Sequence, residues 1–251
     1  MRVGLGLAAL LFLLPVFTVT AVRGQRASEQ PEEPIQLLPP GEVDSARTLR
    51  VLDGDTVTEM TFSDYLQGVL RAEMPASFAQ DALCAQAVAA RTYTYYKMQN
   101  GGNHGDTADI CTDHTCCQAF LGKDRAADNW GKNAERYEAK IENAVSATDG
   151  QVMLYGGTPI LAVFHSSSAG ETWNSGQVWA QDLPYLQSVS SPEGEGVPNY
   201  YSTVELTEAE FREKFLAARP EADLSGPASG WIQDPVTDGV HVERITIGGV
   251  P

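Results

Sequence analysis

Runs of apolar residues separated by polar turn signals predict a mixture of strands and helices. Residues 47–52 and 56–60 lie on either side of Asp53-Gly54, a pair that favours a tight turn. We therefore expect a β-hairpin at the start of the folded region. Further along, residues 151–155 and 159–165 flank Gly156-Gly157 in the same way, which predicts a second hairpin.

The second arm of this later hairpin is apolar on both faces. Ile160, Leu161, Val163 and Phe164 leave few polar positions between them. A strand covered on both sides has this composition. We therefore expect residues 159–165 to form a central strand.

Helices are predicted by caps and breaks around longer apolar runs. Ser63 is expected to cap a short helix that ends near Glu73, and Ser77 with Gln80 forms a capping box for the next one. The remaining expected elements are a helix over 78–99, a helix over 124–147 interrupted near Gly131, a helix starting at Thr207 with Glu210, and a strand over 240–247. Strict βαβ alternation is absent, so the predicted fold class is α+β, a single mixed domain with helices and antiparallel strands.

An uncharged, mostly apolar run extends from Val3 to Val22. About 20 such residues can cross a bilayer as a helix, whereas the core of a cleaved signal peptide is shorter. We expect residues 1–23 to be a retained anchor in the cell membrane, a single-pass arrangement with the domain outside the cytoplasm. A cleaved signal followed by secretion is the alternative.

The following residues, 24–45, are polar and rich in proline, which predicts a disordered linker. Residues 46–251 remain, enough for one domain with its own core. The net charge of −16 argues against nucleic acid or anionic lipid as the main partner. A neutral or weakly charged polymer is the expected target.

Glu73 is the leading catalytic candidate. It ends an apolar helix just before Pro75, beside Leu70 and Met74. Taken alone, a glutamate at a helix end is a solvated or capping residue. Its apolar neighbours, however, favour the protonated form that can break a glycosidic bond. No second carboxylate has a spacing that marks it as a partner.

Three of the four cysteines lie within a short polar segment that suggests a metal site. Cys111, Cys116 and Cys117 follow His104, and three thiolates with one imidazole make a tetrahedral zinc set. The spacing is that of no common zinc finger, and His114 is a rival fourth ligand. A disulfide from Cys111 to one of the other two cysteines is the alternative.

Other polar residues have weaker patterns. Gln86 and Arg91 follow Glu73 on the next predicted helix, where an amide and a cation can hydrogen-bond a sugar polymer. An arginine paired with an acid at the core edge is the simpler interpretation. His165 and Ser166 are neighbours on a predicted strand, so their side chains point to opposite faces and cannot form a Ser-His pair. Nearby Trp173, Trp179 and Tyr185 can stack on sugar rings or pack in the core.

Several of these segments together resemble the stage II sporulation protein D family, whose members include amidase enhancers. The similarity is carried by residues 65–93, with Ala72-Glu73-Met74-Pro75 and Ala89-Ala90-Arg91-Thr92, and by the segment that begins at His165. The resemblance implies a peptidoglycan lytic transglycosylase in which Glu73 is first acid and then base. It also implies that Arg91 belongs to the active site and that His165, Ser166 and Ser167 line the substrate groove. At Cys84 relatives commonly carry a lysine, and within its predicted helix this cysteine is expected to be a small buried hydrophobe.

The resemblance implies partners and a process as well. The expected substrate is peptidoglycan glycan strands denuded of stem peptides by a sporulation amidase, and the expected process is engulfment of the forespore with membrane engulfment proteins. Some members of the family bind zinc, which implies a structural zinc on His104, Cys111, Cys116 and Cys117. Members continue beyond the point where this chain ends, so a shortened domain is expected. The alternative function is a non-catalytic, glycan-binding activator of a cell-wall amidase.

Overall fold

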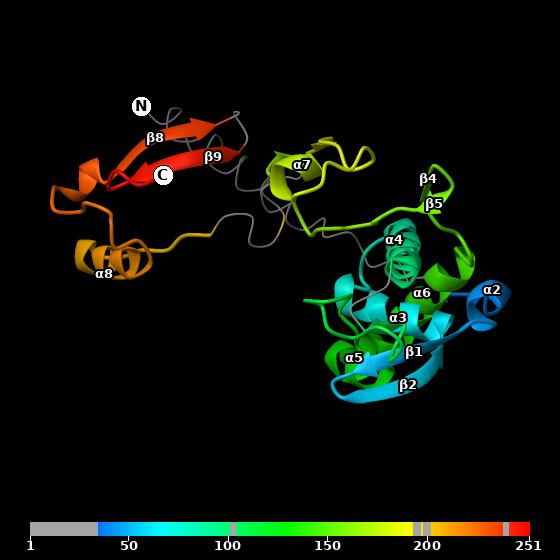
Figure 1. Ribbon diagram of the computed structural model, residues 1–251. Helices are drawn as coiled ribbons and strands as arrows, with labels where there is room; N and C mark the ends of the chain where they lie inside the picture. The colour runs from blue at the N-terminus through cyan, green and yellow to red at the C-terminus, as the bar shows by residue number, and fades with distance from the viewer. Residues whose placement is uncertain (1–34, 101–103, 193–196, 198–201, 238–240) are drawn as a thin grey trace, which may run out of the picture. The chain divides into compact units, whose positions relative to one another are not determined.

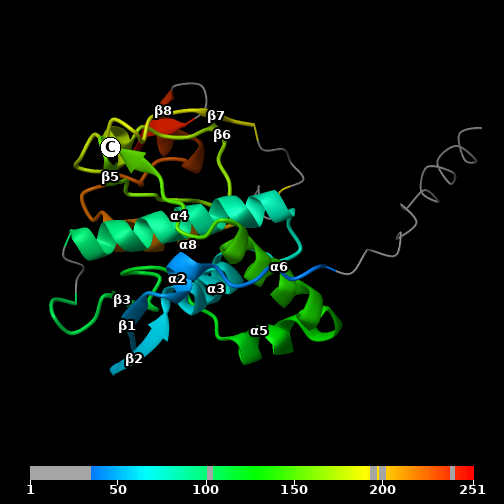
Figure 2. The ribbon, with the colours of Figure 1, turned by 90° about the vertical axis from the view of Figure 1, so that its right-hand side faces the viewer.

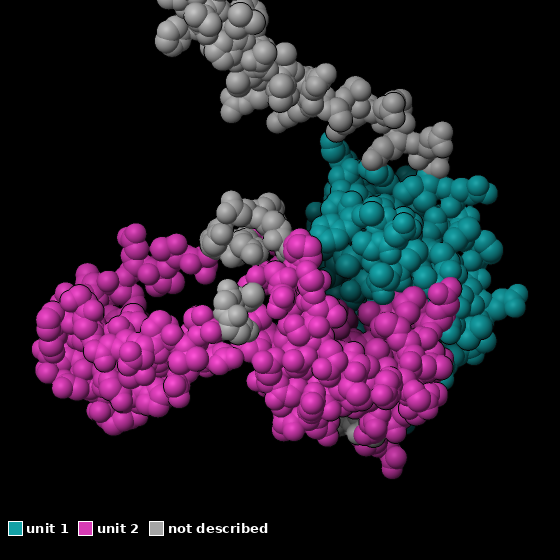
Figure 3. Space-filling model, turned by 90° about the horizontal axis from the view of Figure 1, so that it is seen from above, with its two compact units in different colours: residues 1–87, 111–150 teal, residues 88–110, 151–251 magenta. Residues whose placement is uncertain are grey.

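The computed structural model describes residues 35–100, 104–192, 197, 202–237 and 241–251. Contacts between Cα atoms divide the chain into two compact units, which Figure 3 colours separately. Unit 1 comprises residues 1–87 and 111–150, and unit 2 comprises residues 88–110 and 151–251. The predicted anchor, 1–23, lies outside the described residues.

Unit 1 contains the predicted first hairpin. Strand β1 (Thr48–Asp53) pairs antiparallel with β2 (Thr56–Thr61), from Thr48 opposite Thr61 to Asp53 opposite Thr56. The turn places Gly54 at a φ of 58°, a value that glycine adopts without strain. A short strand, β3 (Ile110–Cys111), extends the sheet in the order β2-β1-β3.

Helices cover this sheet and supply most of the buried apolar side chains of unit 1 (Figure 1). They are α2 (Glu42–Ser45), α3 (Phe62–Glu73), α5 (Lys123–Trp130), the 3₁₀ turn η1 (Gly131–Asn133) and α6 (Ala134–Ala147). The predicted interruption near Gly131 is confirmed, since this glycine ends α5 with a φ of 53°. Helix α3 packs against α6 with apolar side chains such as Leu66, Val69 and Ile141, all without exposed surface.

The long helix α4 (Gln80–Gln99) is seen along its length in Figure 2. It begins two residues later than predicted, and the Gln80 side chain donates to the carbonyl of Lys140 at 3.1 Å. The expected capping box with Ser77 is therefore wrong. The cap predicted for α3 is also wrong: Thr61 accepts the hydrogen bond from the Asp64 amide, while Ser63 is buried. Strand β2 ends at Thr61 and leads directly into α3, so the capping residue of the helix is the last residue of the strand.

Unit 2 begins its sheet structure with a short hairpin of β4 (Leu154–Tyr155) and β5 (Thr158–Pro159). The expected central strand over 159–165 is wrong, because β5 ends at Pro159. The amide of Leu161 is taken by the hydroxyl of Tyr185 at 3.3 Å, and that of Val163 by the carbonyl of Leu161. These two amides are therefore not available to pair with a neighbouring strand.

The rest of unit 2 consists of short elements. These are β6 (Gly170–Glu171), α7 (Ser175–Val178), β7 (Ser190–Ser191), α8 (Glu208–Ala218), the 3₁₀ turn η2 (Ala228–Gly230), β8 (Ile232–Thr237) and β9 (Val242–Ile247). Antiparallel pairs join β6 to β7 and β8 to β9. The predicted cap of α8 is confirmed, since Thr207 and Glu210 form a complete capping box. Helices and antiparallel strands are thus mixed in both units, as the α+β prediction requires.

The last residues assigned to the linker lie on unit 1. The amide of Leu38 donates to the side-chain oxygen of Asn143 at 2.8 Å, and the Asn143 side chain donates to the carbonyl of Gln36 at 2.8 Å. The carboxylate of Asp149 accepts from the amides of Val43 and Asp44. Among the described residues, no helix has the length and apolar character needed to cross a membrane.

Candidate functional site

Glu73 is the last residue of α3 and its carboxylate is half-buried. One carboxylate oxygen, Oε1, accepts a hydrogen bond from the backbone amide of Ala119 at 2.8 Å. Met74 follows in extended conformation, so the helix ends at once and Pro75 leads the chain away. The local sequence therefore places a single carboxyl group at a break in the backbone, held on one side.

The two polar residues predicted on α4 are both buried. Gln86 is 6% exposed, and its Nε2 atom has no hydrogen-bond partner among the described residues. Arg91 has no exposed surface and donates from Nη1 to the carbonyl of Gln151 at 3.2 Å. In this structure Arg91 therefore holds the backbone at the start of the β4 segment, and Gln86 offers an unused donor.

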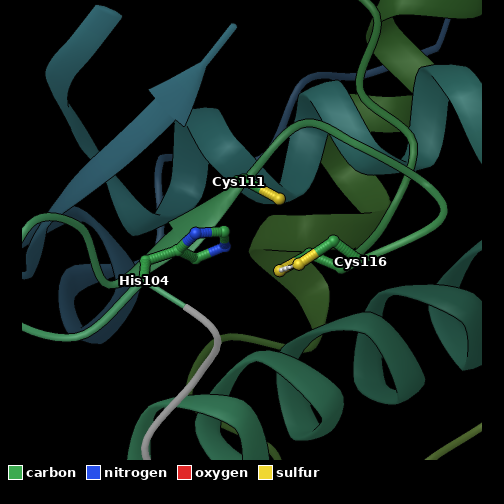
Figure 4. A group of neighbouring side chains, drawn as sticks. His104, Cys111 and Cys116 are labelled. Atoms are coloured by element: carbon green, nitrogen blue, oxygen red, sulfur yellow. Dashed lines mark hydrogen bonds between the residues drawn. The ribbon is translucent and has the colours of Figure 1, made fainter. Parts of the chain in front are cut away.

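The cysteine segment and His104 form a compact cluster. The ligand atoms of His104, Cys111, Cys116 and Cys117 all lie within 4.8 Å of one another. In Figure 4 the imidazole of His104 and the sulfur atoms of Cys111 and Cys116 point toward a common space. The Sγ atoms of Cys116 and Cys117 are 3.7 Å apart. Sulfurs around a tetrahedral zinc are separated by about 3.8 Å, because each Zn–S bond is about 2.3 Å.

The rival ligand, His114, lies elsewhere. Its side chain is 78% exposed and is 3.9 Å from the carboxylate of Asp113. The cysteines follow a tight turn in which the amides of Cys116 and Cys117 both donate to the carbonyl of Asp113. Burial raises the pKa of the Cys111 thiol and that of the Cys117 thiol. A metal that binds these sulfurs would therefore displace protons.

Cys84 has the character expected of a structural cysteine. It lies within α4 and is partly buried. Burial raises the pKa of its thiol, although a hydrogen bond with Gln80 opposes this. A protonated thiol is a poor nucleophile.

Unit 2 contains a groove of about 730 Å³. Of the three residues predicted to contact substrate there, His165 and Ser167 line the groove, and Ser166 does not. His165 donates from Nδ1 to the carbonyl of Ser167 at 3.1 Å, which turns the segment back on itself. Glu73 and Gln86 belong to unit 1, and Arg91 belongs with the groove residues to unit 2.

Several aromatic side chains line the groove. Trp173, Trp179 and Tyr185 all line it, and the ring of His241 lies over that of Trp173 with centroids 3.9 Å apart. The sequence identified the first three as sugar-stacking candidates. His241 was missed, since nothing near it in the sequence marks it and only the fold brings it to Trp173. The amide of Ala119 was missed for a similar reason, because a backbone donor leaves no signal in the side-chain pattern.

Part of the chain that carries these residues is similar to known proteins. Residues 53–155 match the family model described as "Stage II sporulation protein". This segment belongs to the stage II sporulation protein family. The sequence-based assignment is thus confirmed, and the matched range includes Glu73, Gln86, Arg91 and the whole cysteine cluster.

Curated relatives agree with this match. The chain is 33% identical over 195 residues to "Stage II sporulation protein D" of Bacillus subtilis, which covers 77% of this chain and 55% of that protein. It is 34% identical over 160 residues to the Bacillus amyloliquefaciens protein of the same name, covering 63% and 46%. It is also 33% identical over 180 residues to "Amidase enhancer" of Bacillus subtilis, covering 72% and 21%. The chain thus spans about half the length of the stage II sporulation proteins that it matches.

Proposed function

We propose that this protein cleaves the glycan strands of peptidoglycan as a lytic transglycosylase during sporulation, with Glu73 as its catalytic acid and base. The observation that carries the proposal is the Glu73 carboxylate itself. It is half-buried, held by the Ala119 amide, and placed within the segment that matches the family. Relatives named for a sporulation stage and for enhancement of an amidase support a role at the cell wall.

One carboxyl group suffices for this chemistry. Glu73 gives its proton to the bridging oxygen beside a muramic acid residue as the bond from that oxygen to C1 breaks. The C6 hydroxyl oxygen of the same sugar then bonds to C1, and its proton returns to Glu73. The product ends in a 1,6-anhydro ring, and no water enters. A hydrolase would instead need a second carboxylate across the bond.

Other residues have supporting roles in the proposal. The groove of unit 2 holds sugar rings against Trp179 and Tyr185, with His165 and Ser167 at its side. Gln86 is given no contact with glycan, because its side chain is buried and its Nε2 atom is closed off from solvent, contrary to the prediction from the sequence. Arg91 acts from within the core through the backbone of Gln151.

We also propose a zinc ion in the cysteine cluster. The donor set fits, because three sulfur atoms and one imidazole lie within 4.8 Å of one another, and the 3.7 Å between the sulfurs of Cys116 and Cys117 is close to the spacing around a tetrahedral zinc. The ion would be held by His104, Cys111, Cys116 and Cys117. All four positions are filled by protein, so it would fix the loop and take no part in the reaction.

The proposal also includes the location of the protein and its partners. The apolar run of residues 3–22 would hold the chain in the cell membrane, with both units on the outer side. Its substrate would be glycan already stripped of stem peptides by a sporulation amidase, working beside the engulfment proteins of the membrane. The net charge of −16 argues against nucleic acid as the main partner.

A second candidate function is a glycan-binding activator of a cell-wall amidase. The relative named "Amidase enhancer" favours it. Such an activator would bind glycan through the aromatic groove of unit 2 and would not use the carboxyl group of Glu73.

Mass spectrometry of denuded glycan strands separates the two functions. The full chain should release fragments with anhydro-muramic ends, and Glu73→Gln should release none, because the amide keeps the shape and removes the proton. Glu59→Gln on the exposed face of β2 is the matched control and should behave as the unchanged protein. Intact glycan with the unchanged chain, together with activation of an amidase that survives Glu73→Gln, would support the activator instead.

A further inference from the structure

The segment 118–121, between the cysteine cluster and α5, lies against the helix that carries Glu73. Three contacts connect them. The amide of Ala119 donates to Glu73 Oε1 at 2.8 Å, and the amide of Leu121 donates to the carbonyl of Gly68 at 3.0 Å. Between these two hydrogen bonds, the ring of Phe120 stacks on Tyr65 with centroids 6.0 Å apart.

Gly68 allows this close approach. A Cβ atom at this position would overlap the ring of Phe120, so only glycine lets the segment lie on the helix surface. The other end of the loop is fixed as well, since the hydroxyl of Tyr65 donates to the carbonyl of Cys111 at 3.2 Å. The backbone of the loop is therefore anchored to α3 on both sides of Ala119.

We propose that the backbone N–H of Ala119 is a positioning group that decides which oxygen of Glu73 carries the catalytic proton. An amide N–H can only donate, and in a protonated carboxyl group the carbonyl oxygen is a stronger acceptor than the hydroxyl oxygen, so the oxygen held by Ala119 takes the carbonyl role. When Glu73 is protonated, its hydroxyl group is then on the other oxygen, Oε2. That oxygen gives the proton to the leaving bridge oxygen, and it later takes back the proton of the C6 hydroxyl.

This inference rests on the proposed function of Glu73, but its structural half can be tested without activity. The sequence contains only two Gln-Ala pairs, Gln86-Ala87 and Gln118-Ala119. A full chain labelled with 13C-carbonyl glutamine and 15N-alanine therefore gives two carbonyl-linked amide signals in an NMR spectrum. In Glu73→Ala the Ala119 signal should move upfield and its hydrogen exchange should become faster, while the Ala87 signal stays in place. An unchanged Ala119 signal would overturn the proposal.

The functional half is tested with two substitutions at the same residue. Ala119→Pro removes the donor and should lower kcat for anhydro-muramic release by about 100-fold with little change in KM, since a misplaced catalytic group costs about that much. Ala119→Gly keeps the N–H and should retain kcat within about threefold. Equal kcat values for the proline and glycine variants would refute the positioning role. Inactivity of the unchanged chain would refute the proposed function instead. In that case the NMR measurement would still show whether the Ala119 amide contacts Glu73. The same measurement tests the contact if Ala119→Pro fails to fold.

Discussion

At the scale of single residues, the contact between Gly68 and Phe120 leads to a prediction on stability. Gly68→Ala places a methyl group where the Phe120 ring lies, so the ring and the segment that carries it must move. Overpacking of this kind costs about 1–3 kcal/mol. Urea unfolding should show the loss, and kcat should fall as well because the Ala119 amide moves with its neighbour.

Gly226 provides the control for this substitution. A Cβ atom at Gly226 meets nothing within 4 Å, and the residue is exposed. Gly226→Ala should therefore change the free energy of unfolding by no more than about 0.5 kcal/mol. If the two alanine variants unfold at the same urea concentration, the packing of Phe120 on Gly68 is not tight.

At the scale of elements, an ion pair fixes α3 to α6. Arg71 donates from Nη2 to Oε1 of Glu138 at 2.6 Å and from Nε to Oε2 at 3.0 Å, and both side chains are at least nine-tenths buried. Arg71→Met leaves Lys123, 3.3 Å away, as the cation next to the buried carboxylate, so the cost at neutral pH should be about 3 kcal/mol, the lower end for a broken buried pair. The double variant with Glu138→Met restores an apolar pair and should recover most of that loss. Chemical unfolding of the single and double variants measures both effects, and a double variant no more stable than Arg71→Met would contradict the expected recovery.

The same pair predicts how stability depends on pH. Burial opposes ionisation of Glu138, but hydrogen bonds and positive charge from Arg71 and Lys123 outweigh it and lower its pKa below the ordinary 4.5. A group whose pKa is lower in the folded state stabilises the fold above its unfolded pKa. This contribution is therefore complete above about pH 5 and is lost as the pH falls through 4.5 and below. Glu138→Gln should flatten the loss of stability below pH 4.5, as measured by urea unfolding at several pH values, and an unchanged slope would contradict the assignment.

The cysteine loop is the second element whose stability can be predicted. A zinc ion on four protein ligands should appear as one equivalent of metal per chain in elemental analysis, and a chelator should lower Tm because the loop loses its cross-link. Cys111→Ser should lose the metal, whereas Cys84→Ser, outside the cluster, should keep it. The disulfide alternative predicts no metal and a chain mass about 2 Da lower than that of the reduced form.

The secondary-structure elements also show how much of the fold could be predicted from the sequence. The first hairpin, the helix break at Gly131 and the cap at Thr207 were predictable because each depends on residues close in sequence. The strand expected over 159–165 failed because its composition does not reveal the hydroxyl of Tyr185, which takes one of its amides. The predicted start of α4 was also wrong, and there the Gln80 side chain contacts Lys140, a residue far away in the sequence.

The candidate site was predictable to a similar extent. Glu73 and the ligands of the cluster could be named from local motifs. The choice of His104 over His114 needed the fold, because both histidines are close to the cysteines in sequence and only one turns its ring toward them. The stacking of His241 on Trp173 connects residues far apart in the chain, which no local pattern contains.

At the scale of the whole molecule, the two units supply different parts of the proposed reaction. Unit 1 contributes the carboxyl group of Glu73, and unit 2 contributes the aromatic groove. In the proposed function the groove binds substrate and transition state alike, whereas the carboxyl group acts only in the transition state. Substitutions in the two units should then affect different kinetic constants.

Trp179 tests this division. It lines the groove with its side chain partly exposed, so Trp179→Ala removes a stacking surface without opening the core. KM for denuded glycan strands should rise by about tenfold, a loss of about 1.4 kcal/mol of binding, with kcat nearly constant. Val204→Ala, at a residue of unit 2 that is 80% exposed and outside the groove, should leave both constants unchanged. A fall in kcat without a rise in KM would mean that Trp179 acts on the reaction itself, and an unchanged KM would mean that glycan binds elsewhere. Glu73→Gln should abolish turnover and leave glycan binding intact. Comparison of Glu73→Gln with Trp179→Ala therefore also tests whether binding and cleavage depend on residues of different units.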